Sequence, residues 1–138
     1  MEFHWSPVAM DHARHPRHHG PLTRFNSHAR ITGPCGDTME FWLQVEGGRI
    51  VDASFITDGC GSSLASGSVT ATLAIGRTLA EASALTQRTV LTVLGGLPKA
   101  EEHCALLAVT TLQAACRVYA ESQQSPCSTE AGFDESVE

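Results

Sequence analysis

The stretch that decides the fold is residues 33–61, which read GPCGDTMEFWLQVEGGRIVDASFITDGCG. Within it, residues 38–46 alternate between apolar and polar side chains, and residues 50–57 do so again after a Gly47-Gly48 pair. Alternation with a period of two is typical of strands with one buried face, and adjacent glycines favour a tight hairpin turn. The stretch therefore predicts an antiparallel hairpin with a cysteine near each open end.

The register of this hairpin decides which side chains share its buried face. A strict two-residue turn at 47–48 would place the acid Asp52 opposite Leu43, and a one-residue slip moves every side chain to the other face. We therefore expect a three-residue turn, 47–49, with a bulge glycine and a core face of Val51, Ala53 and Phe55. The apolar pairs of this register are Phe41 with Phe55, Leu43 with Ala53 and Val45 with Val51.

The same register brings chemistry-bearing residues together at the open end of the hairpin. It places Gly36 opposite Cys60 and Asp37 opposite Gly59. Directly opposed residues of antiparallel strands lie about 5 Å apart at Cα. Cys35 and Cys60 are thus expected to be neighbours in space although they are distant in the sequence.

Helices are predicted before and after the hairpin in the sequence, together with a short strand over 28–32. Ser6 and Pro7 suit the start of the first helix, Ser62 or Ser63 can cap the second, and small residues let that second helix lie close to the sheet. The predicted helices span 5–15, 62–75, 78–85, 87–94 and 98–121. The last helix should bury Leu106 or Leu107, Thr111 or Leu112, Ala115, Val118 and Tyr119. The expected fold is α+β, a small antiparallel sheet of about three strands packed against helices.

Composition describes one compact domain with an acidic end. The chain has 138 residues, 42% hydrophobic and 17% charged, and its net charge of −6 argues against binding nucleic acid through phosphate neutralisation. We place the domain at 1–121 and a flexible acidic tail at 122–138, which holds no Lys or Arg. No run is apolar enough for a membrane span and the first residues do not resemble a secretory signal, so we expect a cytoplasmic protein with reduced thiols.

Candidate ligands lie at the ends of the predicted elements. Cys35 precedes a strand, Cys60 lies between a strand and a helix, and His103 with Cys104 lies near the start of the last helix. Soft thiolates select zinc, copper(I) or iron–sulfur clusters, and a helix N-terminus favours the negative charge of a thiolate at Cys60. Asp37 can supply a harder, weaker ligand or a base. The spacing alone leaves open that the three cysteines are separate and structural, and periodicity does not bring Cys104 to the hairpin.

Other candidate side chains favour structural roles. Cys116 lies too far along its helix to share a site with Cys104 and is expected in the core, whereas Cys127 falls in the tail. Trp42 is expected to pack. A solvated or structural role is favoured over metal binding for the N-terminal histidines, which are His4, His12, His15, His18 and His19.

Four stretches together resemble the iron–sulfur cluster assembly scaffold family, the IscU/NifU N-terminal type. They are DHARHPRHHG (11–20), GPCGDTM (33–39), IVDASFITDGCGSSLASGS (50–68) and GGLPKAEEHCALLA (95–108). The resemblance implies a scaffold that builds and transfers a labile 2Fe–2S cluster. It implies Cys35, Cys60, Cys104 and His103 as cluster ligands, with Asp37 linked to metal binding and to cluster lability. Permanent clusters have four cysteine ligands, so a weaker fourth ligand suits a cluster that must leave.

The resemblance also implies partners. These are a cysteine desulfurase as sulfur donor, an iron source or frataxin-like protein, and acceptor apoproteins, with no enzymatic turnover by the protein itself. Best-known members carry LPPVK before the His-Cys pair, whereas residues 97–101 read LPKAE, which argues against docking to a dedicated Hsp70-type chaperone. The interval from Cys60 to Cys104 lacks the long insert of the zinc-binding SufU-like branch.

Three alternatives remain open at this point. The first is a zinc-binding sulfur acceptor of the SufU-like type, and the second is a zinc-stabilised interaction domain. The third is a thiol enzyme with a cysteine nucleophile, His103 as base and Asp37 as orienting group. Zinc in the isolated protein would not refute the scaffold, since the same ligands bind both metals.

Overall fold

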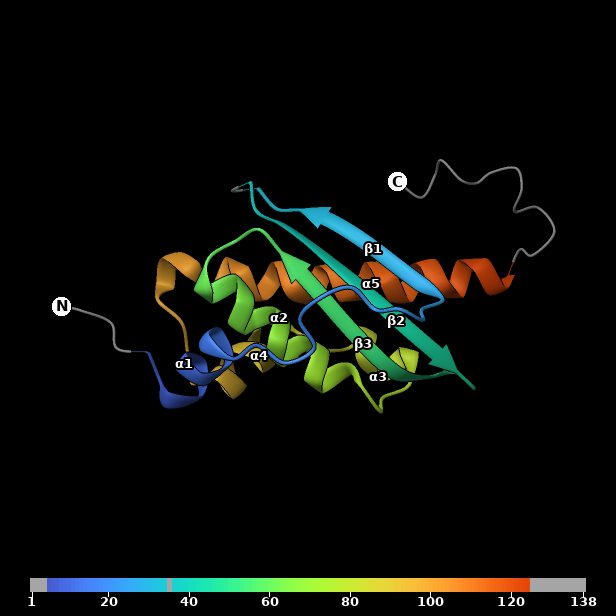
Figure 1. Ribbon diagram of the computed structural model, residues 1–138, viewed down its shortest axis with the longest axis horizontal. Helices are drawn as coiled ribbons and strands as arrows, with labels where there is room; N and C mark the ends of the chain where they lie inside the picture. Colours follow the sequence, from blue (N-terminus) through green and yellow to red (C-terminus); the bar gives the residue numbers. More distant parts are fainter. Residues whose placement is uncertain (1–4, 35, 125–138) are drawn as a thin grey trace.

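The protein forms one sheet layer covered by helices (Figure 1). The structure is a computed structural model that describes residues 5–34 and 36–124. The predicted α+β class is confirmed: a three-stranded antiparallel sheet in the order β1-β2-β3 packs against helices. The elements are α1 (Pro7–Arg14), β1 (Ser27–Thr32), β2 (Thr38–Glu46), β3 (Arg49–Thr57), α2 (Gly61–Ala74), α3 (Leu79–Ser83), α4 (Gln87–Leu94), the 3-10 helix η1 (Lys99–Glu101) and α5 (His103–Gln124).

The β2–β3 hairpin has the predicted register only in the half that faces away from its turn. Phe41 pairs with Phe55 as expected, but the register shifts after Gln44, and Val45 pairs with Ile50. The predictions of a three-residue turn, of a Val45–Val51 pair and of Val51 in the core were wrong. Gly47 and Gly48 both have positive φ, which a two-residue turn between twisted strands requires. The extra residue therefore lies in β3 as a bulge, and Val51 is 44% exposed while Ile50 is buried.

Helix α2 lies unusually close to the sheet because its residues are small. A Cβ added to Gly67 would lie 2.3 Å from the Phe55 ring. The predicted cap was wrong: the N-cap residue is Cys60, and no side chain caps the helix. Ser62 and Ser63 lie in the first turn and are fully buried, so their hydroxyls are available for interior contacts.

Helix α5 crosses the sheet against β1 and β2 and passes α2 (Figure 1). Pro98 precedes η1, and the α-helix begins only at His103. Of the predicted pairs, Leu107 is buried while Leu106 is 49% exposed, and both Thr111 and Leu112 are buried. The helix continues to Gln124, three residues into the range assigned to the tail, and the rest of that range lies outside the described residues.

The N-terminal segment is attached to the core through polar contacts. Ser6 caps α1 and donates to the Leu94 carbonyl. His12 Nδ1 lies 2.6 Å from the Ser68 hydroxyl of α2, and burial, with the nearby Arg17 guanidinium, lowers the pKa of His12. A structural role is thus confirmed for His12. His15, His18 and His19 are exposed, and His4 lies outside the described residues.

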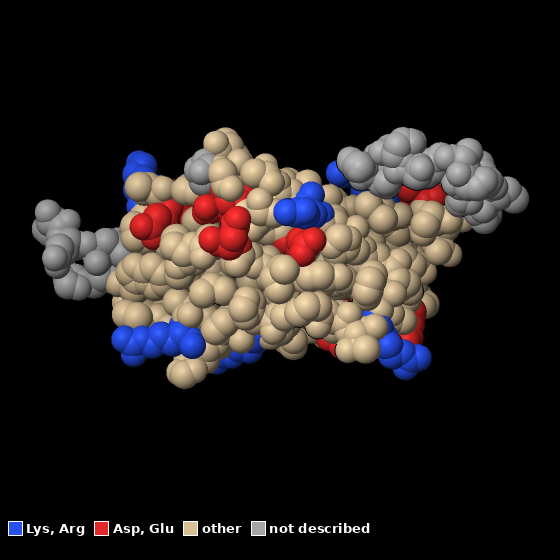
Figure 2. All heavy atoms as spheres, turned by 45° about the horizontal axis from the view of Figure 1, so that its top comes forward, with Lys and Arg blue, Asp and Glu red and all other residues tan. Residues whose placement is uncertain are grey.

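The surface carries mixed charge. On the face drawn in Figure 2, Lys and Arg are scattered rather than gathered into one patch. On the outer side of the sheet, Trp42 is 9% exposed and its ring lies 5.2 Å from that of His28, so the predicted packing of Trp42 is confirmed. Among the described residues, no helix is long and apolar enough to cross a membrane.

Candidate metal site

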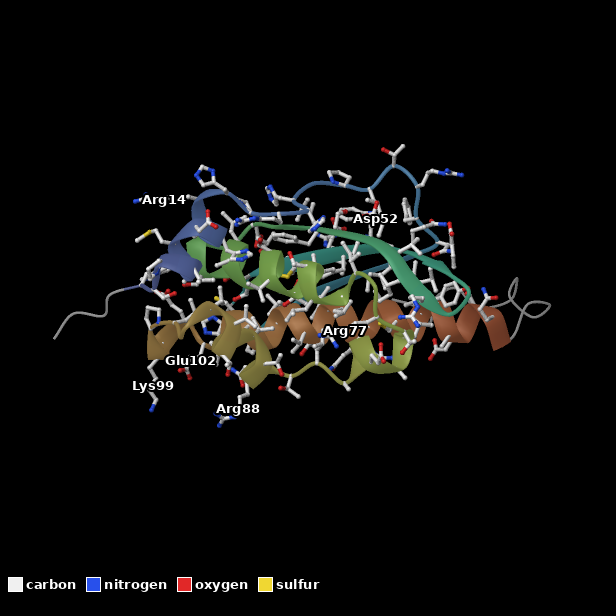
Figure 3. The ribbon with its side chains drawn as sticks, turned by 90° about the horizontal axis from the view of Figure 1, so that it is seen from below. Arg14, Asp52, Arg77, Arg88, Lys99 and Glu102 are labelled. Carbon is white, nitrogen blue, oxygen red and sulfur yellow. The ribbon has the colours of Figure 1, made fainter. Side chains whose placement is uncertain are left out.

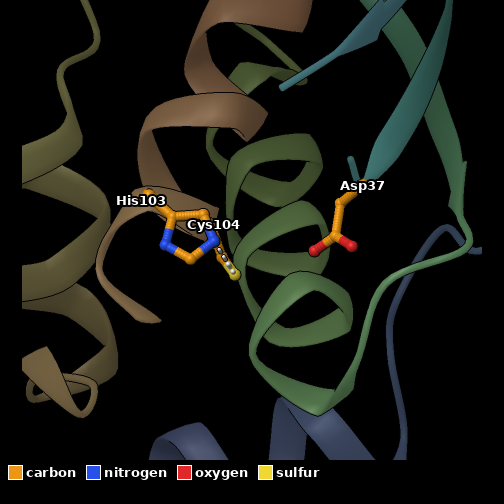
Figure 4. A group of neighbouring side chains, drawn as sticks. All are labelled: Asp37, His103 and Cys104. Carbon is orange, nitrogen blue, oxygen red and sulfur yellow. Dashed lines mark hydrogen bonds between the residues drawn. The ribbon is translucent and has the colours of Figure 1, made fainter. Parts of the chain in front are cut away.

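Three potential ligands from two distant parts of the sequence lie together at one end of the sheet. The ligand atoms of Asp37, His103 and Cys104 all lie within 4.8 Å of one another. Figure 4 shows the carboxylate of Asp37, the residue just before β2, facing the ring and the sulfur at the start of α5. His103 Nε2 lies 3.8 Å from Cys104 Sγ. The structure therefore brings Cys104 to the hairpin, which the sequence pattern alone could not do.

The backbone around Asp37 is held by the open end of the hairpin. The Thr38 amide donates to the Asp58 carboxylate at 2.8 Å, and the Gly33 amide donates to the Asp37 carbonyl at 2.8 Å. Asp37 lies beside Gly59, as the register predicted. A Cβ on Gly59 would lie only 3.0 Å from Asp37 Oδ2. The glycine thus leaves the space that the carboxylate occupies.

Two helix N-termini point their partial positive charge toward this end of the molecule. Cys60 is the N-cap of α2, and His103 is the first residue of α5. The unpaired N–H groups of a helix N-terminus favour carboxylates and thiolates nearby. Both helix N-termini therefore lie at the end of the molecule that holds the candidate ligands.

Ser63 belongs to the site although the sequence analysis assigned it only a capping role. Its hydroxyl lies 3.4 Å from Cys104 Sγ and 3.5 Å from Asp37 Oδ2, and the residue is fully buried. Helical spacing could have revealed it, since residue 63 lies about one turn after Cys60 and therefore on the same side of α2.

Of the two remaining predicted ligands, the structure describes Cys60 but not Cys35. Cys60 is exposed, and its sulfur is not one of the atoms that lie within 4.8 Å of one another in the Asp37–His103–Cys104 group. It still lies at the start of α2, directly beside the turn that carries Ser63. Cys35 lies outside the described residues, so the expected Cys35–Cys60 neighbourhood stays a prediction.

The segment before His103 is fastened to the rest of the site region. The Ser62 hydroxyl donates to the Glu101 carboxylate, and the Gln87 side chain donates to the Glu102 carbonyl at 3.0 Å. Figure 3 shows Glu102 with Arg88 and Lys99 along one margin of the molecule, where the two basic side chains point outward. Glu101 of the divergent LPKAE sequence thus makes a hydrogen bond that links this segment to α2.

The arrangement combines one sulfur, one imidazole and one carboxylate. Such a mixed donor set suits zinc or iron, and the carboxylate is the hardest and most readily exchanged of the three ligands. As a nucleophile Cys104 is poorly placed, because it is only 1% exposed. Of the three cysteines in the described part of the chain, Cys60 is the exposed one.

Cys116 is confirmed as a core residue. It is 3% exposed, and burial raises the pKa of the Cys116 thiol, while a hydrogen bond with Ser83 lowers it in part. A thiol that stays protonated among apolar neighbours is a poor ligand. The second cysteine of α5 is therefore structural.

Comparison with known proteins agrees with the fold and the motifs. A family model described as "NifU-like N terminal domain" matches residues 4–126. The iron–sulfur cluster assembly scaffold protein IscU 1 of Archaeoglobus fulgidus is 36% identical over 112 residues, covering 80% of this chain and 73% of that protein. The IscU scaffold protein of Haemophilus influenzae is 35% identical over 124 residues, covering 86% of this chain and 98% of that protein.

Two solved structures share the fold. The N-terminal NifU-like protein of Brucella abortus has a TM-score of 0.71 at 19% identity, with 84% of this chain and 94% of that chain covered. A putative scaffold protein for the SUF system from Fervidobacterium islandicum has a TM-score of 0.65 at 22% identity, with 80% and 95% covered. The chain belongs to the NifU-like N-terminal family, the iron–sulfur cluster assembly scaffold family that its motifs resemble.

Proposed function

We propose that this protein is a scaffold on which a 2Fe–2S cluster is assembled and from which it is transferred. The observation that carries the proposal is the grouping of Asp37, His103 and Cys104 within 4.8 Å, at one end of a NifU-like fold. The relatives named as iron–sulfur cluster assembly scaffolds support the same role. The cluster is the cargo of such a protein, so the protein itself performs no turnover.

The proposed ligands are Cys35, Cys60 and Cys104, with His103 or Asp37 completing the set. Three thiolates hold iron and sulfide firmly, whereas an imidazole or carboxylate exchanges more easily than a fourth thiolate. The same set accepts zinc when iron and sulfide are absent. A site with one exchangeable ligand can release its cluster without unfolding.

The exposure of the cysteines suggests how sulfur arrives. Cys60 is exposed at the N-cap of α2. A persulfide on a desulfurase can pass its outer sulfur to a thiolate that reaches it, with the desulfurase cysteine leaving as the thiolate. We therefore assign Cys60 as a sulfur acceptor and the buried Cys104 as a ligand.

The proposed partners follow from this chemistry. They are a cysteine desulfurase, an iron donor such as a frataxin-like protein, and apoproteins that accept the cluster. Docking to a dedicated Hsp70-type chaperone is not proposed, since the LPKAE segment places an acid at residue 101 and that acid bonds to Ser62. The cytoplasm is the proposed compartment, because thiol ligands must stay reduced.

A zinc-binding sulfur acceptor of the SufU-like type is the second candidate. The observation that favours it is that the described residues bring three potential ligands together, the number of protein ligands in an open zinc centre. The two functions differ in their product. A sulfur acceptor carries sulfur and zinc, whereas the scaffold carries iron and acid-labile sulfide in equal amounts.

The test is anaerobic assembly from ferrous iron, cysteine and a cysteine desulfurase. We expect a coloured protein with equal iron and acid-labile sulfide and the charge-transfer spectrum of a 2Fe–2S cluster, which moves to an apo-ferredoxin on mixing. Cys60→Ala should lose the cluster. A zinc-bound protein that takes up sulfur but no iron would overturn the proposal in favour of the sulfur acceptor.

A further inference from the structure

The site contains a buried hydroxyl between its carboxylate and its sulfur. Ser63 Oγ lies 3.4 Å from Cys104 Sγ and 3.5 Å from Asp37 Oδ2. A hydroxyl has a single proton to donate, so it can serve only one of these two acceptors at a time. We infer that Ser63 is a positioning residue that holds Cys104 and Asp37 for metal binding and donates its hydrogen bond to the metal-bound sulfur.

The position of the Ser63 hydroxyl is set by the fold. Ser63 is fully buried in the first turn of α2, which gives its side chain little freedom to turn toward solvent. The hydroxyl lies against the Gly59 backbone, where an added Cβ would be 2.3 Å from Ser63 Oγ and 3.0 Å from Asp37 Oδ2. Gly59 therefore leaves room for the serine hydroxyl and the carboxylate to face each other.

Ser63 can follow the change that metal binding makes at the sulfur. A Cys104 thiol can donate to the hydroxyl oxygen, whereas a metal-bound thiolate can only accept. The hydroxyl proton then points at the sulfur, and Asp37 Oδ2 gives up its weaker contact and becomes available to the metal. Ser63 thus releases one ligand as it stabilises the other, through one rotation of an O–H bond.

A hydrogen bond to a coordinating sulfur has a spectroscopic consequence. It withdraws electron density from the thiolate and so raises the energy of sulfur-to-metal charge transfer. Outer partners of metal ligands also contribute about 10-fold to 100-fold to metal affinity. Loss of the Ser63 hydroxyl should therefore weaken metal binding and move the charge-transfer band to longer wavelength.

The same helix offers a matched control. Ser66 is also fully buried in α2, but its hydroxyl has no hydrogen-bond partner among the residues that the structure describes. Ser66→Ala removes the same atom at the same depth without touching the site. Both substitutions keep a small side chain with good helix propensity, so both variants should fold.

The experiment is anaerobic titration of the full chain with Co²⁺, followed by absorption in the charge-transfer region. Because the inference rests on the proposed function, Cys104→Ala is included to test the site itself. We expect Cys104→Ala to weaken the sulfur-to-cobalt band, because it removes one of the proposed thiolate ligands. Ser63→Ala should keep the band, shift it to longer wavelength and lower the affinity about 10-fold, and Ser66→Ala should match the unmodified protein.

The outcomes distinguish a failure of the role inferred for Ser63 from a failure of the proposed metal site. If Cys104→Ala weakens the band while Ser63→Ala and Ser66→Ala both match the unmodified protein, the role of Ser63 is overturned and the site stands. A weaker affinity in Ser63→Ala without any shift of the band would also overturn it, since a packing defect alone would give that result. If Cys104→Ala leaves the band unchanged, the site and the inference both fail.

Discussion

Helix α5 carries two buried cysteines, of which one is a proposed metal ligand and the other a core residue. Cys104 and Cys116 are 1% and 3% exposed, so burial does not distinguish them. Cys104 lies at the start of the helix, where His103 and Asp37 are within ligand distance. Cys116 lies in the middle of the helix, where Ser83 is the polar neighbour and burial raises the pKa of its thiol.

The contrast teaches that the ends of elements create this site. The residue before β2, the first turn of α2 and the start of α5 converge there, and each brings a polar side chain. The middle of α5 packs against the sheet through apolar residues and offers no second ligand to Cys116 among the described residues. The same side chain is thus a proposed ligand at one position and a core residue at the other.

The largest expected effect is a difference in cluster content between variants of the two cysteines. After anaerobic reconstitution, Cys104→Ala should hold less than about one tenth of the iron and acid-labile sulfide of the unmodified protein, because a ligand is lost outright. Cys116→Ala should keep its cluster and lose only stability, by about 1 kcal/mol for a small cavity. Equal cluster content in the two variants would refute the distinction.

A pair of glycines provides a second comparison, between the site and its surroundings. Gly59→Ala would place a Cβ 2.3 Å from Ser63 Oγ and 3.0 Å from Asp37 Oδ2, whereas the nearest atom to a Cβ on Gly61 is 3.5 Å away, on Trp5. We expect Gly59→Ala to lose several-fold in iron content and about 1–3 kcal/mol in stability. Gly61→Ala should change neither, and iron analysis with urea unfolding measures both. An unimpaired Gly59→Ala would show that the site tolerates displacement of α2.

The smallest effect is the pH dependence that Cys116 contributes. Its folded-state pKa is raised, mainly by burial, so the folded protein holds the thiol proton more tightly than the unfolded chain does. This contribution is complete below about pH 8.5, where the unfolded thiol begins to ionise, and is lost as the pH rises. Unfolding in urea should therefore show a steeper loss of stability above that pH for the unmodified protein than for Cys116→Ala. Parallel curves would mean that the thiol is not protected by the core.

The hairpin shows what the sequence could and could not predict. Alternation predicted the Phe41–Phe55 pairing and the approach of Asp37 to Gly59, because one buried face fixes the register. It could not predict the bulge at Val51, since Val45 has an apolar partner whether it pairs with Val51 or with Ile50. There the conformational freedom of two adjacent glycines decided the outcome.

The site was predictable in its residue types but not in its assembly. The resemblance pointed to Cys104, but only the packing of α5 across the sheet explains why its sulfur meets Asp37. Ser63 was interpreted as a cap because serine before an apolar run favours that role. The backbone of Cys60 took the cap position instead, which left the Ser63 hydroxyl to face the site.

The most direct test of the account is X-ray absorption at the iron edge of the anaerobically reconstituted protein. The account predicts iron with sulfide and thiolate sulfur, one nitrogen or oxygen ligand, and a neighbouring iron at the short distance of a 2Fe–2S cluster. Iron surrounded by oxygen and nitrogen alone, without a neighbouring iron, would contradict it.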